Sequence, residues 1–301
     1  MPPASSPRVA VIGLGSMGFG MATALLRAGL DVTGCDVVSA TVERFVAGGG
    51  HGAPTPAEAV KAADIVVTVV VNAAQTEAVL FGADGAVAAM PEGAVVVSSA
   101  TMDPEIARSL ARRVGDTGRL YLDAPISGGA QRAAEGALTV LASGSRAAFS
   151  KAKPALDAVA ATLYDLGDEP GQGAAFKMIN QLLAGVHIAA ASEAMAFAAR
   201  QNLDLRRVYE VITASAGNSW MFENRMPHVL DADYAPRSAV EIFVKDLGIV
   251  QDMARGARFP VPMAAAALQM FLATAASGMG RDDDASVARL YAMMGGAKLP
   301  E

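Results

Sequence analysis

Short apolar runs alternate with longer amphipathic stretches along the first half of the chain. The runs are rich in Val, Ile and Leu and are bounded by glycine or charged residues, which indicates strands. The stretches between them are mostly Ala-rich and amphipathic, so the order of elements predicts a parallel sheet built from βαβ units. The run IVVTVVV at 65–71 is apolar at nearly every position, as expected of a strand covered by helices on both faces. The predicted strands are residues 8–13, 30–36, 64–71, 94–99, 119–125, 137–144 and 162–167.

The pattern changes in the sequence GDEPGQG, where we place the domain boundary at about 168–172. From Gly171 onward there is no clear strand, and residues 174–202 form one helical pattern that would span roughly 43 Å. Because this helix is apolar on most sides, we expect it to be buried between domains or between subunits. The chain is therefore predicted to be an α/β protein. An N-terminal Rossmann-type doubly wound sheet at 7–168 would be followed by a long interdomain helix and an all-α C-terminal domain at 169–301.

Two further segments bear on location. Residues 260–280 are long and apolar, but they are mostly alanine, contain Gln269 and begin with two prolines, so we interpret them as a buried helix. The first seven residues, MPPASSP, lack the positive and apolar regions of a signal peptide and predict a short lead-in. A cytoplasmic protein is expected.

The amino-acid composition and net charge exclude several classes of function. With 52% hydrophobic and 18% charged residues, the chain has the composition of a compact globular protein. Its net charge of −6 speaks against nucleic-acid and membrane partners, which favour basic surfaces. A single cysteine, Cys35, excludes an internal disulfide, and the histidines His51, His187 and His228 form no spaced ligand set, so no metal site is expected. A small-molecule partner is the remaining expectation.

The sequence GLGSMG at 13–18 follows the first predicted strand and opens a helix. In a phosphate cradle, the first glycine permits a tight turn, the second lets the backbone approach a pyrophosphate, and the third lets helix and strand pack closely. Asp36 closes the second strand 18 residues after Gly18, close to the spacing of the dinucleotide fingerprint. These features predict a dinucleotide site formed by Gly13, Leu14, Gly15, Ser16, Met17, Gly18 and Asp36.

The choice between the two nicotinamide dinucleotides depends on Asp36. Its carboxylate can accept hydrogen bonds from the ribose hydroxyls and would repel a 2′-phosphate. The next residues, VVSA, supply no arginine to hold that phosphate. NAD is therefore the predicted cofactor.

Four motifs occur in one order: GLGSMG at 13–18, DAPISGG at 123–129, GAAFKMIN at 173–180 and KDLGI at 245–249. This set resembles the β-hydroxyacid dehydrogenases, the family of 3-hydroxyisobutyrate dehydrogenase, tartronate semialdehyde reductase and L-threonate dehydrogenase. The resemblance covers nearly the whole chain. It implies that Lys177 is the catalytic group. A lysine partly removed from water beside a cationic cofactor can take the hydroxyl proton as hydride leaves, and its ammonium can polarise the carbonyl in reverse.

The same resemblance implies roles for further residues. Asn180 and Gln181 share a helix face with Lys177 and would orient it or the substrate. Ser127, Gly128 and Gly129 follow a strand and would bind a substrate carboxylate. Cofactor contacts are implied for Thr101, where the family more usually has Ser-Thr than this chain's Ala100-Thr101, and for Lys245, with Asp246 as its ion-pair partner.

The segment GNSWMFENR at 217–225 contains the only tryptophan. One interpretation is that Trp220, Asn218, Ser219 and Asn224 line the substrate pocket. The alternative is that Trp220 is a core residue. The sequence of this segment is most similar to the L-threonate dehydrogenase branch of the family.

The resulting hypothesis is NAD-dependent oxidation of a small carboxylate-bearing 3-hydroxy acid, with L-threonate as the leading substrate. The alternatives within the family are a reductase of tartronate or succinate semialdehyde and a 3-hydroxyisobutyrate dehydrogenase. A non-catalytic nucleotide-binding module would need a decayed lysine motif or an added basic domain, and the sequence has neither. The resemblance and the long apolar helix also imply a homodimer or homotetramer.

Overall fold

The computed structural model describes residues 6–301. The chain divides into two compact units, Met1–Lys177 and Met178–Glu301, and each is described by itself. The lead-in predicted at residues 1–7 lies outside the described residues apart from Ser6 and Pro7.

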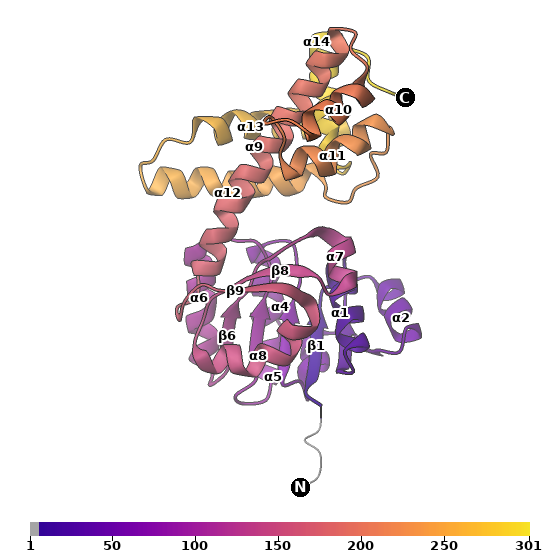
Figure 1. The fold of residues 1–301 in the computed structure, drawn as a ribbon. Coiled ribbons are helices and arrows are strands. Elements are labelled where there is room, and N and C mark those ends of the chain that lie inside the picture. Colours follow the sequence, from indigo (N-terminus) through magenta and orange to yellow (C-terminus); the bar gives the residue numbers. More distant parts are fainter. Residues whose placement is uncertain (1–5) are drawn as a thin grey trace. The chain divides into compact units, whose positions relative to one another are not determined.

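A parallel six-stranded sheet forms the centre of the first unit, with the strand order β3-β2-β1-β4-β5-β6 (Figure 1). This order, in which the chain runs outward from β1 first one way and then the other, is that of a doubly wound dinucleotide-binding fold and confirms the predicted fold class. The strands are β1 (Arg8–Ile12), β2 (Asp31–Cys35), β3 (His51–Gly52), β4 (Ile65–Thr68), β5 (Val95–Ser98) and β6 (Leu120–Asp123).

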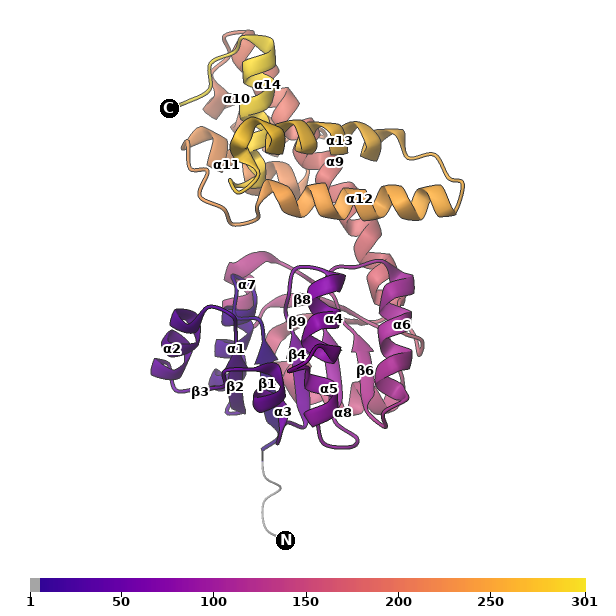
Figure 2. The ribbon, with the colours of Figure 1, turned by 180° about the vertical axis from the view of Figure 1, so that it is seen from behind.

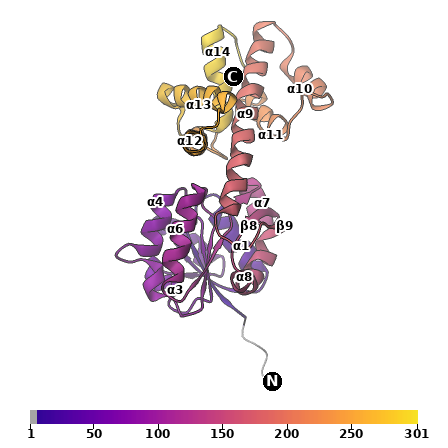
Figure 3. The same cartoon turned by 90° about the vertical axis from the view of Figure 1, so that its left-hand side faces the viewer.

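Helices cover both faces of this sheet. They are α1 (Gly18–Arg27), α2 (Ser39–Ala47), α3 (Pro56–Val60), α4 (Ala73–Phe81), α5 (Ala86–Ala89), α6 (Pro104–Gly115), α7 (Gly129–Glu135) and α8 (Arg146–Val159). Figure 3 views the unit with α3, α4 and α6 on one side and α1 and α8 on the other, and Figure 2 looks onto the first of these sides. Successive strand residues point to opposite faces. Accordingly Val9 and Val11 belong to the core under α1 and α8, whereas Ala10 and Ile12 belong to the core under α3 to α6.

The last two predicted strands exist but do not join the main sheet, so the prediction of one sheet was wrong. They form a second sheet, ordered β7-β8-β9, from β7 (Ile126–Ser127), β8 (Leu138–Ala142) and β9 (Ala160–Asp165). Strand β8 is antiparallel to β7 and parallel to β9. Hydrophobic periodicity identifies a strand but does not identify its neighbours, which explains the error.

The second unit is helical. Its helices are α9 (Gln172–Arg200), which begins in the first unit, α10 (Leu205–Thr213), α11 (Trp220–Leu230), α12 (Val240–Gly256), α13 (Pro262–Thr274) and α14 (Val287–Gly295), with short helical turns η1 (Ala275–Met279) and η2 (Asp284–Ser286). Helix α9 has 29 residues and agrees with the predicted long helix. Its residues take part in both cores of the unit, one with α12 and α13 and the other with α10, α11 and α14. A Cβ at Gly185 would lie 2.9 Å from Leu247, so α9 and α12 approach closely there.

Two helices of the described residues are long and apolar enough to meet the criterion for a membrane span, Gln172–Arg200 and Pro262–Met279. Within the most apolar stretch of each, 44% and 28% of the residues are buried. Length and composition alone are weak evidence for a membrane span, because core helices of globular proteins meet the same criterion. The interpretation of 260–280 as a buried helix needs correction, since Met263 and Leu272 are exposed and only one face packs inward.

Candidate active site

The glycine-rich turn joins β1 to α1. Gly13 has a positive φ of 95°, and a Cβ there would lie 2.4 Å from the carbonyl oxygen of Val69. A Cβ at Gly18 would lie 1.9 Å from the carbonyl oxygen of Gly13. By contrast, nothing lies within 4 Å of a Cβ built at Gly15. The first and third glycines are therefore required by the protein's own packing, whereas the second leaves open space beside the backbone.

Backbone donors of this turn are available to an anion. The first backbone hydrogen bond of α1 is donated by Phe19 to Gly15, at 3.0 Å. Within residues 6–301, the N–H groups of Gly15 to Gly18 donate to no backbone acceptor. Unpaired N–H groups at a helix N-terminus, together with the helix dipole, form a site for phosphate. The open space at Gly15 and these donors fit the pyrophosphate of a dinucleotide.

Asp36 directly follows β2 and is bonded to the same turn. Its Oδ2 accepts a hydrogen bond from the N–H of Leu14 at 2.6 Å, and its Oδ1 accepts one from Val38 at 2.8 Å. Asp36 and Glu43 both line a hollow between the end of β2 and α2. The nearest cation in sequence, Arg44, lies over the ring of Phe19 at 4.1 Å. The hollow thus presents two carboxylates next to the glycine-rich turn.

Cys35 precedes this carboxylate and is buried. Burial, and then the charge of Asp36, raises the pKa of its thiol to about 11. A thiol with this pKa is protonated at neutral pH, and the protonated form is not the nucleophile.

The turn of the DAPISGG motif lies between β7 and α7. Ser127 ends β7 opposite Thr139 of β8 and is partly exposed. Gly128 and Gly129 have positive φ values of 140° and 79°, which only glycine adopts readily. A Cβ at Gly129 would meet nothing within 4 Å. The turn therefore presents a hydroxyl and open backbone, the features expected of a carboxylate-binding turn.

The carboxyl ends of the parallel strands bring the first unit's candidates to one edge of the sheet. The glycine turn follows β1, Asp36 follows β2, Thr101 comes after β5, and Ser127 comes after β6. Ligands of open α/β sheets bind outside this edge. The sequence predicted these residues separately, and the strand order explains why they gather.

Lys177 lies on α9, five residues after the helix begins, and only 7% of it is exposed. The start of this helix is held by the first unit. Asp123 Oδ2 accepts hydrogen bonds from the N–H groups of Gly171 and Ala174, and Ser143 Oγ accepts one from Gly173. Lys177 is therefore a buried amine on a helix whose N-terminus is fixed by side chains from the sheet region.

In the second unit, a chain of polar contacts connects α9 with α12. Asn180 Nδ2 donates to Gln181 Oε1 at 3.0 Å, and Gln181 Nε2 donates to Asp246 Oδ2 at 2.5 Å. Asp246 is buried and forms an ion pair with Lys245, so the predicted pair is present. Gln181, for which a role in orienting Lys177 or the substrate was expected, forms hydrogen bonds with Asn180 and Asp246. This chain of contacts fixes both Asn180 and Lys245.

The segment 217–225 begins α11. Ser219 caps the helix by accepting a hydrogen bond from Phe222 at 3.1 Å, and Asn218 donates to Glu223 at 2.5 Å. Trp220 is 53% exposed, so the alternative that it anchors the core was wrong. In this segment, the structure assigns Asn218 and Ser219 to the start of the helix.

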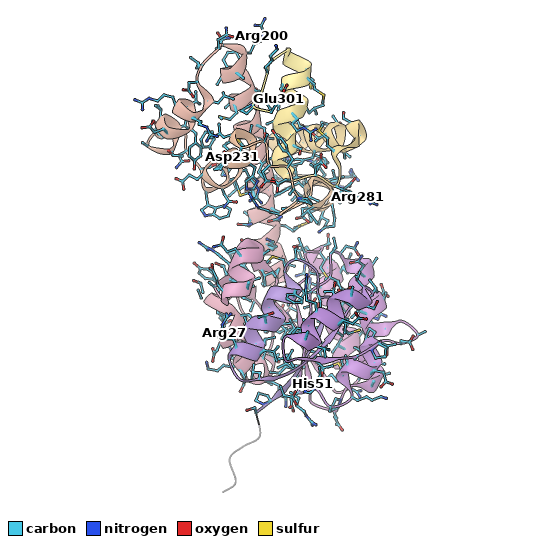
Figure 4. The ribbon with its side chains drawn as sticks, turned by 90° about the vertical axis from the view of Figure 1, so that its right-hand side faces the viewer. Arg27, His51, Arg200, Asp231, Arg281 and Glu301 are labelled. Atoms are coloured by element: carbon cyan, nitrogen blue, oxygen red, sulfur yellow. The ribbon has the colours of Figure 1, made fainter. Side chains whose placement is uncertain are left out.

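Two of the three histidines have contrasting surroundings. His51, labelled in Figure 4, is exposed and lies 3.3 Å from Asp31, whereas His228 is buried with its Nδ1 2.8 Å from Asp283. His228 is therefore held in the interior by Asp283, whereas His51 lies at the surface. Within residues 6–301, no group of three or more His, Cys, Asp or Glu residues is arranged to hold a metal ion.

Sequence reasoning missed Asp123 and Ser143. Asp123 opens the DAPISGG motif and ends a strand, a position that could have marked it as a candidate. Ser143 carries no such signal, because its partners at the start of α9 lie 30 residues further along the chain.

Comparisons with known proteins agree with this geometry. Residues 8–167 match the model of the NAD-binding domain of 6-phosphogluconate dehydrogenase. Residues 171–291 match the model described as NAD-binding of NADP-dependent 3-hydroxyisobutyrate dehydrogenase. Together these two matches cover both units.

Full-length relatives are similar over almost the whole chain. L-threonate dehydrogenase from Cupriavidus necator is 54% identical, with 95% of this chain and 96% of the relative covered. The enzyme of the same name from Pectobacterium atrosepticum is 49% identical, with 97% and 96% covered. The crystal structure of 3-hydroxyisobutyrate dehydrogenase from Salmonella typhimurium has a TM-score of 0.91 at 49% identity, covering 95% of this chain and 100% of that chain.

Proposed function

Because the chain belongs to the family of 3-hydroxyisobutyrate dehydrogenase, the β-hydroxyacid dehydrogenases, we propose that it oxidises L-threonate with NAD. The protein is an NAD-binding dehydrogenase of hydroxy acids. Two relatives named L-threonate dehydrogenase, at 54% and 49% identity, support the choice of substrate.

NAD, when bound, would supply the hydride acceptor. The glycine turn would offer N–H groups to its pyrophosphate, and Asp36 would accept hydrogen bonds from the ribose hydroxyls. Asp36 and Glu43 disfavour a 2′-phosphate in the hollow that they line. In the second unit, Lys245 is the proposed cofactor contact, and Asp246 holds its side chain.

A buried lysine on the family's catalytic motif is the observation that carries this proposal. As the substrate carbon loses hydride, its hydroxyl must lose a proton, and Lys177 Nζ accepts it. In reverse, the ammonium returns the proton to the forming hydroxyl. Burial keeps bulk water away from the amine, so that the proton is exchanged with the substrate. For the substrate carboxylate we propose Ser127 and the N–H groups of Gly128 and Gly129, and for its hydroxyls Asn180.

The test is NADH formation over a panel of C3 to C5 hydroxy acids, with the variant Lys177→Ala. We expect L-threonate to give the highest kcat/KM. We expect Lys177→Ala to lose about 10²- to 10⁴-fold in kcat, the usual contribution of an acid–base group, while calorimetry finds NAD binding unchanged. The control is Lys153→Ala, which removes an exposed lysine of α8 paired with Asp157. A fully active Lys177→Ala protein contradicts the proposal.

The same assay separates the other functions. Faster turnover with tartronate or succinate semialdehyde and NADH would indicate a reductase, and preference for 3-hydroxyisobutyrate would indicate the dehydrogenase of that acid. NAD binding with no turnover of any acid would indicate a nucleotide-binding module.

We further propose that residues 169–301 provide substrate contacts and a subunit interface. An exposed apolar stripe on α9 supports the interface. It contains Ile179, Leu183, Val186, Ala190, Ala194 and Phe197, spaced three or four residues apart, with Val186 half-buried and the others exposed. Such a stripe is favourable when a second copy covers it, which supports a homodimer or homotetramer.

A further inference from the structure

We propose that Asp123 and Ser143 form a socket that positions Lys177 by holding the first turn of α9. This inference rests on the proposed catalytic role of Lys177. Neither residue is assigned a contact with substrate or cofactor, and both act through the helix that carries the lysine.

The two side chains are held together by the backbone. The N–H of Asp123 donates to the carbonyl of Ser143 at 3.0 Å, and the N–H of Ser143 donates to the carbonyl of Asp123 at 2.8 Å. In addition, Ser143 Oγ donates to Asp123 Oδ2 at 3.3 Å. This reciprocal pair joins the end of β6 to the end of β8. The socket is therefore built on two strands, which position a site more rigidly than a loop does.

Three N–H groups at the start of α9 point into this socket. Gly171 and Ala174 donate to Asp123 Oδ2 at 2.9 and 2.8 Å, and Gly173 donates to Ser143 Oγ at 3.0 Å. These groups have no partner inside the helix, so external acceptors are needed when they are buried. A Cβ at Gly173 would lie 2.2 Å from the carbonyl oxygen of Leu141, so the helix starts directly against the strand backbone.

Lys177 follows Ala174 by three residues, and residues at this spacing are neighbours on one helix face. The rise between them is about 4.5 Å. Hydrogen bonds at 171, 173 and 174 fix both the direction of the helix axis and the rotation of the helix about it. A small change in either would displace the amine of Lys177, and displacements of about 1 Å at a reacting group can reduce a rate about 10²-fold.

The energetics favour a positioning role over a purely structural one. Burial raises the pKa of Asp123 to about 6, although the hydrogen bonds from Ala174, Gly171 and Ser143 oppose this rise. The ionised carboxylate therefore makes the folded state less stable at neutral pH than a neutral side chain of the same shape would. What the charge provides is stronger hydrogen bonds to the helix, since those to an ionised acceptor are about twice as strong as neutral ones.

The socket also differs from the other helix caps of the chain. Ser145 caps α8 through an N–H three residues away, and Asp204 caps α10 through N–H groups two and three residues away. By contrast, the socket residues are 30 to 51 residues from the N–H groups that they bind. Ser145 and Asp204 are therefore matched controls, because each is a local cap of the same chemical type.

The experiment compares Asp123→Asn and Ser143→Ala with the controls Asp204→Asn and Ser145→Ala. For each, kcat and both KM values are measured with NAD and the best acid of the panel. Amide hydrogen exchange of the 171–177 segment and thermal unfolding are measured on the same proteins. For the socket variants we expect kcat to fall roughly 10- to 100-fold with both KM values within about threefold, and exchange at Gly173 and Ala174 to accelerate. Asp123→Asn is expected to unfold at the same or a higher temperature than the parent protein.

A double-mutant comparison separates positioning from general damage. In a Lys177→Ala background, Asp123→Asn is expected to cause no further loss of kcat, because both changes remove the same function. Additive losses, or socket variants whose kcat equals that of the controls, overturn the inference. So does a fall in kcat that is matched by a fall in unfolding temperature and a rise in both KM values. If Lys177→Ala is fully active, the proposed function itself fails; if it is inactive while the socket variants are normal, only the positioning role fails.

Discussion

The N–H of Leu14 donates a hydrogen bond to Asp36 Oδ2 at 2.6 Å. The carboxylate proposed to bind the ribose is therefore also the group that fixes the glycine turn against the end of β2. Its two oxygens accept hydrogen bonds from Leu14 and Val38, and the same side chain lines the hollow with Glu43. In the proposed function, this one side chain would link the position of the pyrophosphate to the recognition of the ribose.

This link predicts the behaviour of Asp36→Asn. The amide keeps one acceptor oxygen but removes the charge that repels a 2′-phosphate. We expect the ratio of kcat/KM for NAD to that for NADP to fall at least about tenfold, since a shift of 1.4 kcal/mol is enough. Steady-state kinetics with both cofactors measures this ratio. Asp31→Asn, at the exposed start of the same strand, is the control and should leave it unchanged. An unaltered ratio in Asp36→Asn would contradict the assignment.

Gly15→Ala separates ligand binding from folding. Nothing lies within 4 Å of the added methyl, so the free energy of unfolding should change little. The methyl would, however, stand where the pyrophosphate approaches the backbone, and we expect the dissociation constant of NAD to rise about tenfold or more. Calorimetric titration and chemical denaturation give the two values. Gly13→Ala provides the contrast, because its φ of 95° and the 2.4 Å approach to Val69 should make it unstable. Tight NAD binding by Gly15→Ala would contradict the assignment of the glycine-rich turn as the pyrophosphate site.

Asp246→Asn tests the contacts between α9 and α12. The change removes the charge that pairs with Lys245 and weakens the acceptor for Gln181. We expect the free energy of unfolding to fall by about 1 to 3 kcal/mol, as for the loss of a charged hydrogen-bond partner. We also expect KM for NAD to rise, because Lys245 would lose its fixed position. Asp252→Asn on the exposed side of α12 is the control. A normal KM for NAD together with a normal free energy of unfolding would show that Asp246 neither positions Lys245 nor stabilises the contact between α9 and α12.

Leu183→Glu tests the subunit interface proposed for α9. Leu183 is exposed on the apolar stripe, where a carboxylate would have to be buried if a second copy covers it. We expect the sedimentation coefficient to show smaller assemblies than the parent protein. Arg207→Glu, at an exposed position of α10, is the charge-changing control. A parent protein that is monomeric at assay concentration would contradict the interface.

Stability should depend on pH through two buried carboxyl groups. Burial raises the pKa of Asp123 and of Asp284 to about 6, from a usual value of 3.8. Between these values the folded state binds a proton that the unfolded state does not. The contribution of each group to the free energy of unfolding should therefore grow as pH falls from 6 toward 3.8, reaching about 2 to 3 kcal/mol, and it is lost as pH rises through 6. In Asp123→Asn the contribution of this residue should be absent. Urea unfolding of parent and variant at pH 7.5, 6.0 and 4.5 tests this, and parallel pH curves for the two proteins would contradict it.

The sequence was sufficient to predict the elements that depend on local pattern. The strands β1, β2, β4, β5 and β6 and the helix α9 all follow from apolar periodicity and length. The two-residue strand β3 is too short to leave a pattern, and the membership of β8 and β9 in a second sheet depends on tertiary pairing. These features could not be predicted from the periodicity of a segment alone.

In the candidate site too, residues with a local sequence signal could be predicted and residues joined only by tertiary contacts could not. The glycine turn and Asp36 are close in sequence and carry a known spacing, so they were identifiable. The hydrogen bonds from the start of α9 to Asp123 and Ser143 join segments that are far apart in sequence, so their pairing could not be predicted, although the position of Asp123 in the DAPISGG motif could have marked that residue as a candidate. For Trp220 the sequence left two alternatives, a wall of the substrate pocket or a core anchor, and its exposure at the start of α11 excludes the second.

The boundary between the two units falls between Lys177 and Met178, inside the continuous helix α9. A truncated gene product that stopped at residue 168 would lack the N–H groups of Gly171, Gly173 and Ala174, and would leave Asp123 and Ser143 without them. An exchange of the first unit between proteins would therefore keep these hydrogen bonds only if it carried the first turns of α9 along with it.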